Sequence, residues 1–529
     1  MLPLTQKDQP IVQKLLSAGC CSRCILRFCC VRVQSAYRRP PQETLKELRT
    51  FVSNTENSQD STEPTEENNK SHNAPGSEAP EEPPSKRTKL ESEDEAAAEL
   101  KDEESNVCVV CLGILQEFCG PAQAAKIAET VKAQNYQFDT LVLSVSLPAQ
   151  LCVRENSCWL HVKEEIGQKG LTLDKDDVIQ VKEAFKWIMQ GLVAKELGGV
   201  SVVTKSAFEV GVEFTHEATD SDCHFLASVC PDCFKPTKNK QSVFTRMAVI
   251  KALEKTSDGR FLKLYPCPPV QPSSSCSLQD IQCLHTSVFV AGRYNKFCRS
   301  LPQTPWVIDG ERRMESSVEE LIAAPILSAF RANGFNFSSS GREDVDVRTL
   351  GNGRPFAMEI LNPHKSRFNR AEMKQLQETI NKSSDKIRVR DLQVVSREAM
   401  SRMKEGEEEK TKSYTALIWT QKPIRSEDIT FIDDIKELTL DQKTPLRVLH
   451  RRALAVRQRV IHSMNTRFLD PHHFYLGLKT QAGTYIKEFV HGDFGRTNPN
   501  LCQLLKTDTD ILELDVESVD VDWPPAIPE

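Results

Sequence analysis

Two Cys-x-x-Cys pairs, separated by a long acidic segment, most strongly limit how the first part of this chain folds. Cys21 and Cys24 precede the segment, and Cys108 and Cys111 follow it. Residues 52–106 are poor in aliphatic side chains and rich in Glu, Ser, Asn and Pro. Such a composition cannot bury enough apolar surface to offset its ordering entropy. We therefore expect a disordered acidic linker between two ordered pieces of one accessory domain.

The four cysteines predict one structural Zn²⁺. Each pair offers two thiolates to a tetrahedral ion, and the long gap costs little because closure entropy grows only logarithmically with loop length. The first residues lack the pattern of a secretory signal, so we expect the 18 cysteines in a reducing compartment. Two alternatives stay open: the pairs are unrelated core residues, or Cys20 replaces a neighbour as ligand. Cys230 and Cys233 form a further pair without an evident partner pair.

The charge of the chain is unevenly distributed. The net charge is −6, but residues 51–106 carry −11 and the remainder therefore +5. A mildly basic folded part permits an anionic partner. Within the linker, the basic run 83–90 predicts a nuclear import signal recognised by the import machinery, and hence a protein of nucleus and cytoplasm; a chance cluster is the alternative. The chain has no apolar run of membrane-spanning length, so we expect no membrane association.

Hydrophobic periodicity predicts two further folded regions. Residues 107–283 have the pattern of an α/β accessory domain, with helices and strands in the ranges 122–133, 141–147, 176–197, 208–214 and 243–255. Residues 1–51 supply its first part, with helices at 11–16 and 43–51. In residues 284–529 closely spaced strands predict a mixed, mainly antiparallel sheet. We place strands at 287–294, 354–361, 387–395, 413–420, 456–463, 472–480 and 512–518, and helices at 318–332 and 370–381.

The run from Gly341 to Phe356 is the first candidate for chemistry. It brings three carboxylates and three arginines together between glycines, which allow positive φ and close approach of the backbone to a ligand. The order Gly-Arg-x-Asp, then Val-x-Val, then an apolar run places Asp344 at a loop tip supported by strand. A solvated charged loop is the alternative.

Two basic segments, 293–313 and 443–459, are candidates for RNA contacts. Phosphates are bound by cations, and exposed bases stack on aromatic rings. Either could instead be a solvated turn. The candidate residues are Thr304, Trp306, Arg312, Arg313, Lys443, Arg447, His450, Arg451, Arg452 and Arg457.

The sequence Gly483-Thr484-Tyr485-Ile486-Lys487 predicts the end of a strand and a helix capped by Thr484. Tyr485 and Lys487 would then project near the strand's end. The alternative is an ordinary capped core helix.

Together these motifs resemble the pseudouridine synthases. The Gly-Arg-x-Asp loop is similar to the catalytic loop of the TruA type, and the Gly-Thr-Tyr-Ile-Lys run to the Gly-Thr-Tyr-Ile-Arg motif of the TruB type. The order of motifs most resembles the archaeal and eukaryotic Pus-ten type of tRNA pseudouridine synthase. The resemblance spans 284–529 and, more loosely, both cysteine pairs.

The resemblance implies an α+β fold: a mainly antiparallel catalytic domain, an accessory domain containing a THUMP module, and a zinc knuckle. It implies that Asp344 is the nucleophile, that Tyr414 or Tyr485 stacks on the target base, and that Lys487 pairs with the aspartate. Lysine stands here where the TruB type has arginine, and an amine cannot bind the carboxylate through two parallel hydrogen bonds as a guanidinium can. The loops at 304–317 and 442–457 would grip RNA.

The implied reaction isomerises uridine to pseudouridine in the TΨC loop, at tRNA positions 54 and 55. It needs neither redox nor nucleotide cofactor, and the sequence has no Walker loop and no Gly-x-Gly-x-x-Gly after a strand. We expect a monomer. Two alternative functions are a non-catalytic RNA-binding or scaffold protein for other structured RNAs and a zinc-dependent adaptor.

Overall fold

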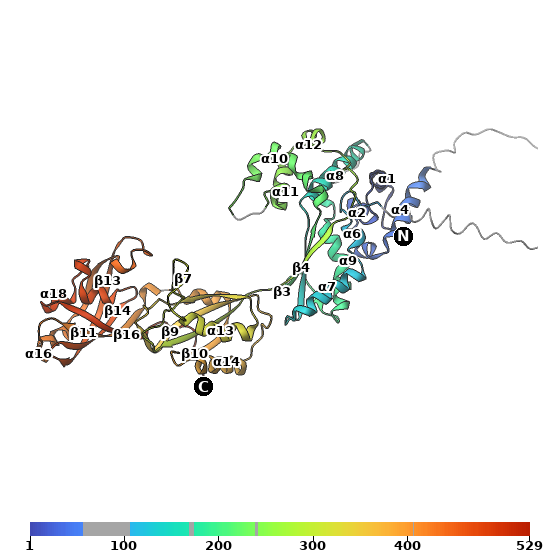
Figure 1. Ribbon diagram of the computed structural model, residues 1–529. Coiled ribbons are helices and arrows are strands. Elements are labelled where there is room, and N and C mark those ends of the chain that lie inside the picture. Colours follow the sequence, from blue (N-terminus) through green and yellow to red (C-terminus); the bar gives the residue numbers. More distant parts are fainter. Residues whose placement is uncertain (57–105, 169–173, 239–241, 406, 529) are drawn as a thin grey trace, which may run out of the picture. The chain divides into compact units, whose positions relative to one another are not determined.

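The structure is a computed structural model that describes residues 1–56, 106–168, 174–238, 242–405 and 407–528 (Figure 1). The acidic stretch with the predicted import signal at 83–90 lies outside the described residues. The chain forms two compact units. The N-terminal unit comprises residues 1–134 and 138–284, and the C-terminal unit comprises residues 135–137 and 285–529.

A four-stranded sheet of order β2-β1-β3-β4 packs against helices in the N-terminal unit (Figure 1). β1 pairs in parallel with both β2 and β3. The alternation of β3 buries Phe208, Val210, Val212 and Phe214 on one face. The elements are α1 (Gln9–Ala18), α2 (Ser22–Phe28), α3 (Gln34–Arg38), α4 (Pro41–Glu56), α6 (Ile114–Glu117), α7 (Pro121–Gln134), β1 (Thr140–Ser146), α8 (Gln150–Gln168), α9 (Val181–Glu196), β2 (Ser201–Val202), β3 (Phe208–Thr215), α10 (His224–Val229), α11 (Arg246–Lys255), α12 (Asp258–Leu264) and β4 (Ser277–His285).

Three expectations for this unit need correction. α4 continues to Glu56, five residues into the segment assigned to the linker. The helix predicted over 176–197 begins at Val181, because residues 175–177 form a separate 3-10 turn. The Asp174 side chain caps this turn by accepting from the backbone N–H of Asp176. The sequence reading missed α8, whose Cys, Ser and Trp residues have only moderate helix propensity.

A ten-stranded sheet forms the C-terminal unit, with the order β10-β5-β9-β16-β11-β14-β13-β12-β15 and β8 paired to β9. The β9–β16 pair is parallel, whereas the other strand pairs of this sheet in the described residues are antiparallel, so the predicted mixed, mainly antiparallel sheet is confirmed. The elements are β5 (Val288–Lys296), β6 (Val307–Ile308), β7 (Glu311–Arg312), α13 (Val318–Phe330), β8 (Gly334–Ser339), β9 (Arg348–Leu361), α14 (Arg370–Ser383), β10 (Ile387–Val395), α15 (Arg397–Arg402), β11 (Thr411–Thr420), α16 (Ser426–Ile429), β12 (Lys436–Lys443), β13 (Val456–Asp470), β14 (His473–Gln481), α17 (Ile486–His491), β15 (Thr497–Asn498), α18 (Leu501–Leu505) and β16 (Thr509–Val519).

Two apolar cores lie along this sheet. α13 and α14 pack on β5, β9 and β10 around Phe356 and Met358. α17 and α18 pack with β11, β14 and β16 around Phe474 and Phe489. The two halves meet at the short parallel contact of β9 with β16, in which Arg348 is the register partner of Asp515. The Gly-Arg-x-Asp loop enters β9 at this junction.

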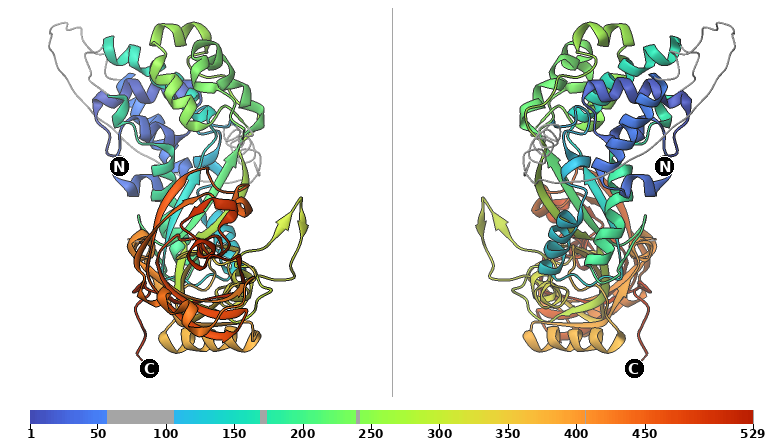
Figure 2. Two further views of the ribbon diagram at one scale, coloured as in Figure 1. Left: turned by 90° about the vertical axis from the view of Figure 1, so that its left-hand side faces the viewer. Right: turned by 90° about the vertical axis from the view of Figure 1, so that its right-hand side faces the viewer.

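The C-terminal unit also corrects three local expectations. Val345 and Asp346 form a turn, and the strand begins at Arg348. Thr484 does not cap α17: the N-cap is Tyr485, while the Thr484 hydroxyl donates to the carbonyl of Gln481 at 2.7 Å. β8 and β12 were missed. β6 and β7 form a hairpin that projects from the rest of the unit (Figure 2). Among the described helices, none has the length and apolar content needed to cross a membrane.

Candidate active site

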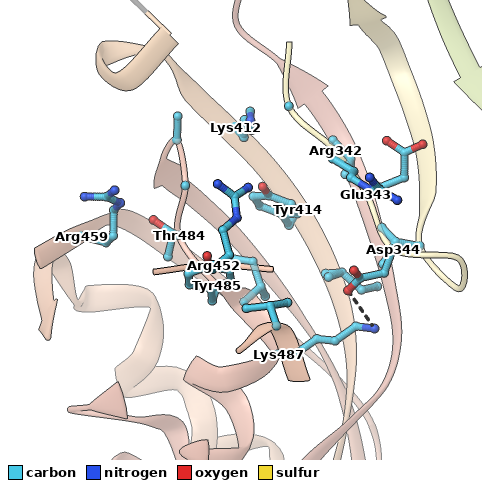
Figure 3. A pocket seen from close by; sticks show the side chains of 18 of the residues that line it. Arg342, Glu343, Asp344, Lys412, Tyr414, Arg452, Arg459, Thr484, Tyr485 and Lys487 are labelled. Atoms are coloured by element: carbon cyan, nitrogen blue, oxygen red, sulfur yellow. Dashed lines mark ion pairs between the residues drawn. The ribbon is translucent and has the colours of Figure 1, made fainter. Parts of the chain in front are cut away.

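A cavity of about 530 Å³ opens beside the Gly-Arg-x-Asp loop in the C-terminal unit (Figure 3). The loop, β11, the 447–459 segment and the start of α17 all contribute side chains. Nine cationic side chains and three carboxylates line it. The cations are Arg342, Arg354, Lys412, Arg447, Arg451, Arg452, Arg457, Arg459 and Lys487; the carboxylates are Glu343, Asp344 and Glu407. This excess of positive charge suits a polyanionic ligand.

Asp344 faces three of these cations. Its carboxylate accepts a hydrogen bond from Arg447 Nη1 at 2.8 Å and lies 3.4 Å from Lys487 Nζ, with Arg451 at 4.0 Å. The side chain is 30% exposed, so a substrate atom can reach it. Lys487 also pairs with Asp346 at 2.8 Å, which holds the pKa of Asp346 below its ordinary value. Asp344 is thus the loop carboxylate that both lines the cavity and is accessible, and its cationic partners fix its orientation.

A buried ion pair supports the loop from below. Arg354 Nε donates to Glu343 at 2.8 Å, and both side chains are almost fully buried. The Tyr294 hydroxyl also donates to Glu343 at 2.8 Å, and Arg354 Nη1 donates to the carbonyl of Ser340. Each charge is therefore paired and hydrogen-bonded, as burial requires. Gly341 adopts φ +86°, and an added Cβ would lie 2.5 Å from Arg354 Nη1.

Lys296 fixes the backbone of the same loop. Its Nζ donates to the carbonyls of Leu301 at 2.7 Å, Asp344 at 3.0 Å and Val345 at 3.1 Å. The residue is fully buried, and burial lowers the pKa of its ammonium to about 8. A buried cation thus ties the end of β5 to the backbone of Asp344.

Tyr414 and Lys412 project from β11 into the cavity, two residues apart and therefore on one face of the strand. Burial raises the pKa of the Tyr414 phenol, which favours the neutral, hydrogen-bonding form. Burial and the nearby Arg354 lower the pKa of Lys412 to about 8. No hydrogen bond or ion pair of its Nζ is found among the described residues, so this ammonium is open to a ligand.

The Gly-Thr-Tyr-Ile-Lys run forms the opposite wall. The Gln442 side chain accepts from Tyr485 N–H at 3.0 Å and donates to its carbonyl at 2.9 Å, which fixes the start of α17. The Arg447 guanidinium lies 6.0 Å from the centre of the Tyr485 ring. Figure 3 shows Tyr414 and Tyr485 on the walls between Asp344 and Arg459. Tyr414, Tyr485 and Lys487 thus share one cavity with Asp344.

The predicted RNA-contacting residues fall into two groups. Arg447, Arg451, Arg452 and Arg457 line the cavity, whereas Lys443 and His450 do not. The 304–317 loop lies outside it: Trp306 is 43% exposed, Arg312 pairs with Glu320, and Arg313 pairs with Glu311. The predicted RNA contact of the 304–317 loop stays a prediction.

The two cysteine pairs meet in the N-terminal unit. The Sγ atoms of Cys21, Cys24, Cys108 and Cys111 all lie within 4.8 Å of one another, a group that could hold a metal ion. Cys20 is not a member. The backbone N–H of Cys21 donates to Cys108 Sγ at 3.3 Å, and Arg27 Nη1 donates to Cys24 Sγ at 3.5 Å. In the described part of the chain no second such group occurs, and Cys230 and Cys233 lack further ligands.

Several residues of the site were not among the sequence candidates. Lys412 could have been found from its spacing, because it precedes Tyr414 by two positions on the same strand. Glu343 and Arg354 were read as loop charges, although they form a buried pair. Neither Lys296 nor Glu488 carries a local signal for its role in the site, since the partners that matter there, Asp344 and Arg447, lie 48 and 41 residues away in sequence.

Comparison with known proteins supplies independent information. A family described as "Pus10, C-terminal" matches residues 289–520, and one described as "Eukaryotic Pus10, N-terminal" matches residues 108–283. Over 100% of both chains, a mouse protein named tRNA pseudouridine synthase Pus10 is 59% identical and its human counterpart 56%. A chain from the crystal structure of a Cbf5–Nop10–Gar1 complex is 14% identical, with a TM-score of 0.24 over 43% of this chain and 48% of that one.

Proposed function

The chain belongs to the Pus10 family of tRNA pseudouridine synthases, and we propose that its cation-lined cavity converts uridine to pseudouridine in tRNA. The observation that carries this proposal is the meeting of Asp344, Tyr414, Tyr485 and Lys487 in one cavity. These four residues come from three separate parts of the chain. The cavity's nine cations also fit the phosphates of an RNA substrate.

Asp344 is the proposed nucleophile. The reaction breaks the N1–C1′ bond, rotates the uracil and forms a C5–C1′ bond, while C5 loses a proton and N1 gains one. A carboxylate attacking C1′ or C6 can form the covalent intermediate that divides this change into two steps. Arg447 and Lys487 hold the carboxylate in position. Atoms and electrons balance without an oxidant, a reductant or an organic cofactor.

The target base must leave its stack before Asp344 can reach it. Tyr414 and Tyr485 provide rings on which the extruded uracil can stack. Arg451, Arg452 and Arg457 provide donors for the adjoining phosphates. The resemblance to the Pus-ten type supports uridines of the TΨC loop, tRNA positions 54 and 55, as the targets.

In the N-terminal unit we propose that the four cysteines hold one structural Zn²⁺. The Sγ atoms of Cys21 and Cys111 are 3.8 Å apart. In a tetrahedral site with Zn–S bonds of about 2.3 Å, neighbouring sulfur atoms are about 3.8 Å apart, which matches this separation. The ion would tie the segment before the acidic stretch to the segment after it. The family resemblance further supports a THUMP module in this unit.

Replacing Asp344 with Asn tests the nucleophile. We expect the D344N variant to form no detectable pseudouridine on an unmodified tRNA transcript while it still binds that transcript, because one carboxylate oxygen is lost and the surrounding cations remain. D434N, at an exposed carboxylate outside the cavity, is the matched control and should keep full activity.

Pseudouridine formation by D344N would refute the nucleophile. A wild-type chain that binds tRNA and yields no pseudouridine would instead favour a non-catalytic RNA-binding protein.

A further inference from the structure

A strained turn lies directly after α17. Gly492, Asp493, Phe494 and Gly495 have φ angles of +83°, +46°, +56° and +82°, so four consecutive residues are left-handed. Glycine adopts this conformation readily, and aspartate tolerates it. A phenylalanine in the left-handed conformation is destabilised by steric repulsion between its Cβ and the following carbonyl oxygen.

Packing does not compensate for this penalty. Phe494 is 95% exposed, more than any other large apolar side chain of the described residues except Met1. Its ring therefore contributes almost no buried apolar area to the fold. Strained backbone that persists without a folding benefit occurs most often where a ligand binds.

The turn is nevertheless held firmly. Arg496 N–H donates to the Asp493 carbonyl at 3.1 Å, and Gly495 N–H donates to the Gly492 carbonyl at 3.0 Å. The buried Asp493 carboxylate accepts from the backbone N–H of Leu446 at 3.3 Å, and Arg496 Nη2 donates to the Thr444 carbonyl at 2.7 Å. These hydrogen bonds fix the backbone that carries the Phe494 ring and link it to the start of the 444–455 segment.

That segment leads straight to the active site. Leu446 precedes Arg447, whose guanidinium contacts Asp344 at 2.8 Å. Arg451 and Arg452 line the cavity from the same segment. The turn that carries Phe494 is thus hydrogen-bonded to the segment that supplies these cations.

We propose that Phe494 is a second base-stacking site, which holds an unpaired nucleobase of the RNA outside the cavity while the target uridine occupies it. Sites for single-stranded RNA combine exposed aromatic rings with cations that bind the backbone. Phe494 is such a ring, on a turn hydrogen-bonded to the arginine-bearing segment. The inference rests on the proposed function, because it takes RNA as the ligand.

A protein partner is the competing occupant. Leu446, Leu454 and Val456 are also exposed, at 44%, 79% and 62%. The arginines of the same segment favour RNA, since the cores of protein interfaces are depleted in charge.

Affinity for an unmodified tRNA transcript tests the site in the full-length chain. F494A should weaken binding about 5- to 100-fold, the range measured for single base–aromatic stacks, whereas F494W should bind as the wild type does. F431A, at an aromatic that is 42% exposed and outside the cavity, is the control and should bind normally.

Two further measurements separate stacking from a packing role. F494G should lose the same affinity yet unfold at a higher temperature than the wild type, because glycine relieves the left-handed strain. In tRNAs with single abasic nucleotides, one position should weaken wild-type binding as F494A does and leave F494A binding unchanged.

Wild-type affinity in F494A, or a lower unfolding temperature in F494G, would overturn the stacking site and leave the proposed function intact. A wild-type chain that does not bind tRNA would refute both.

Discussion

Lys296 offers the sharpest test of how the fold positions the proposed nucleophile. Its buried ammonium donates to three backbone carbonyls, two of them in the Gly-Arg-x-Asp loop at Asp344 and Val345. Methionine has nearly the same length and shape but no donor. We predict that K296M folds, loses stability, and loses much more activity than tRNA affinity.

The size of the effect follows from the lost hydrogen bonds. The Asp344 carbonyl keeps a second donor, the backbone N–H of Val347 at 3.1 Å. The carbonyls of Leu301 and Val345 lose the one donor found for them among the described residues, and leaving a buried acceptor unsatisfied costs about 1–3 kcal/mol. Removing the buried charge also removes the cost of its desolvation, which offsets part of this loss of stability. We expect a net loss of about 2 kcal/mol in the free energy of unfolding and, from a displacement near 1 Å, about 10²-fold in rate.

The pH dependence distinguishes a positioning role from simple packing. The pKa of Lys296 is about 8 in the folded chain, below the ordinary value of 10.5. Above pH 8 the neutral amine retains two N–H groups for three carbonyls, so the wild-type rate should decline through that pH. Between pH 8 and 10.5 the unfolded chain binds the proton more tightly, so this group makes the free energy of unfolding rise with pH. K296M should show neither the decline in rate above pH 8 nor the contribution of this group to the rise in the free energy of unfolding.

Single-turnover rates on an unmodified tRNA transcript between pH 6.5 and 9.5, with urea unfolding of the same preparations, would measure these quantities. K386M, which removes an exposed lysine outside the cavity, is the control. A wild-type rate in K296M, or a decline above pH 8 of equal size in both proteins, would refute the reasoning.

Two further predictions concern the glycine of the loop and the metal. In G341A the added Cβ would lie 2.5 Å from Arg354 Nη1 and 2.6 Å from Lys412 Nζ, so single-turnover activity should fall and thermal stability should drop by about 1–3 kcal/mol. G310A has the same left-handed strain, at φ +78°, but open space around Cβ, so an equal loss there would contradict the clash. Replacing Cys21 and Cys24 by Ser should abolish bound zinc, measured by elemental analysis, and lower thermal stability; the C230S/C233S control should keep its metal, and unchanged zinc in the first variant would remove the proposed site.

Local patterns in the sequence were sufficient for most of the C-terminal sheet. Alternation marks β5, β10, β11 and β14 because each has a regular apolar face against a core. The Gly-Arg-x-Asp and Gly-Thr-Tyr-Ile-Lys motifs led to Asp344, Tyr485 and Lys487, which the structure brings to one cavity. The cysteine spacing led to the metal group, although a long acidic stretch separates its halves.

Other parts of the site were beyond such reasoning because their determinants are not local. β8 carries no strongly buried alternation, since it pairs with β9 through its backbone at the margin of the sheet. Glu343 and Arg354 have the sequence context of a solvated loop, and only the folding of β5 behind them makes them a buried pair. Lys296 also lacks a local signal for burial. A lysine at a strand end is usually exposed, and two of its three carbonyl partners come from a loop 48 and 49 residues later.

The position of Arg447 resolves a difficulty in the motif at the start of α17. Where the TruB type has arginine, this chain has Lys487, whose amine cannot clamp a carboxylate through two donors. The structure supplies a guanidinium from elsewhere. Arg447 is held by Glu488, a buried carboxylate that contacts Nε at 2.5 Å and Nη2 at 3.3 Å, which leaves Nη1 for Asp344 at 2.8 Å. Because Glu488 is the next residue after Lys487, the same helix start that offers the amine also anchors the guanidinium. Asp344 therefore receives one guanidinium donor from Arg447 and the charge of Lys487, in place of two donors from a single arginine, and α17 holds both through adjacent residues.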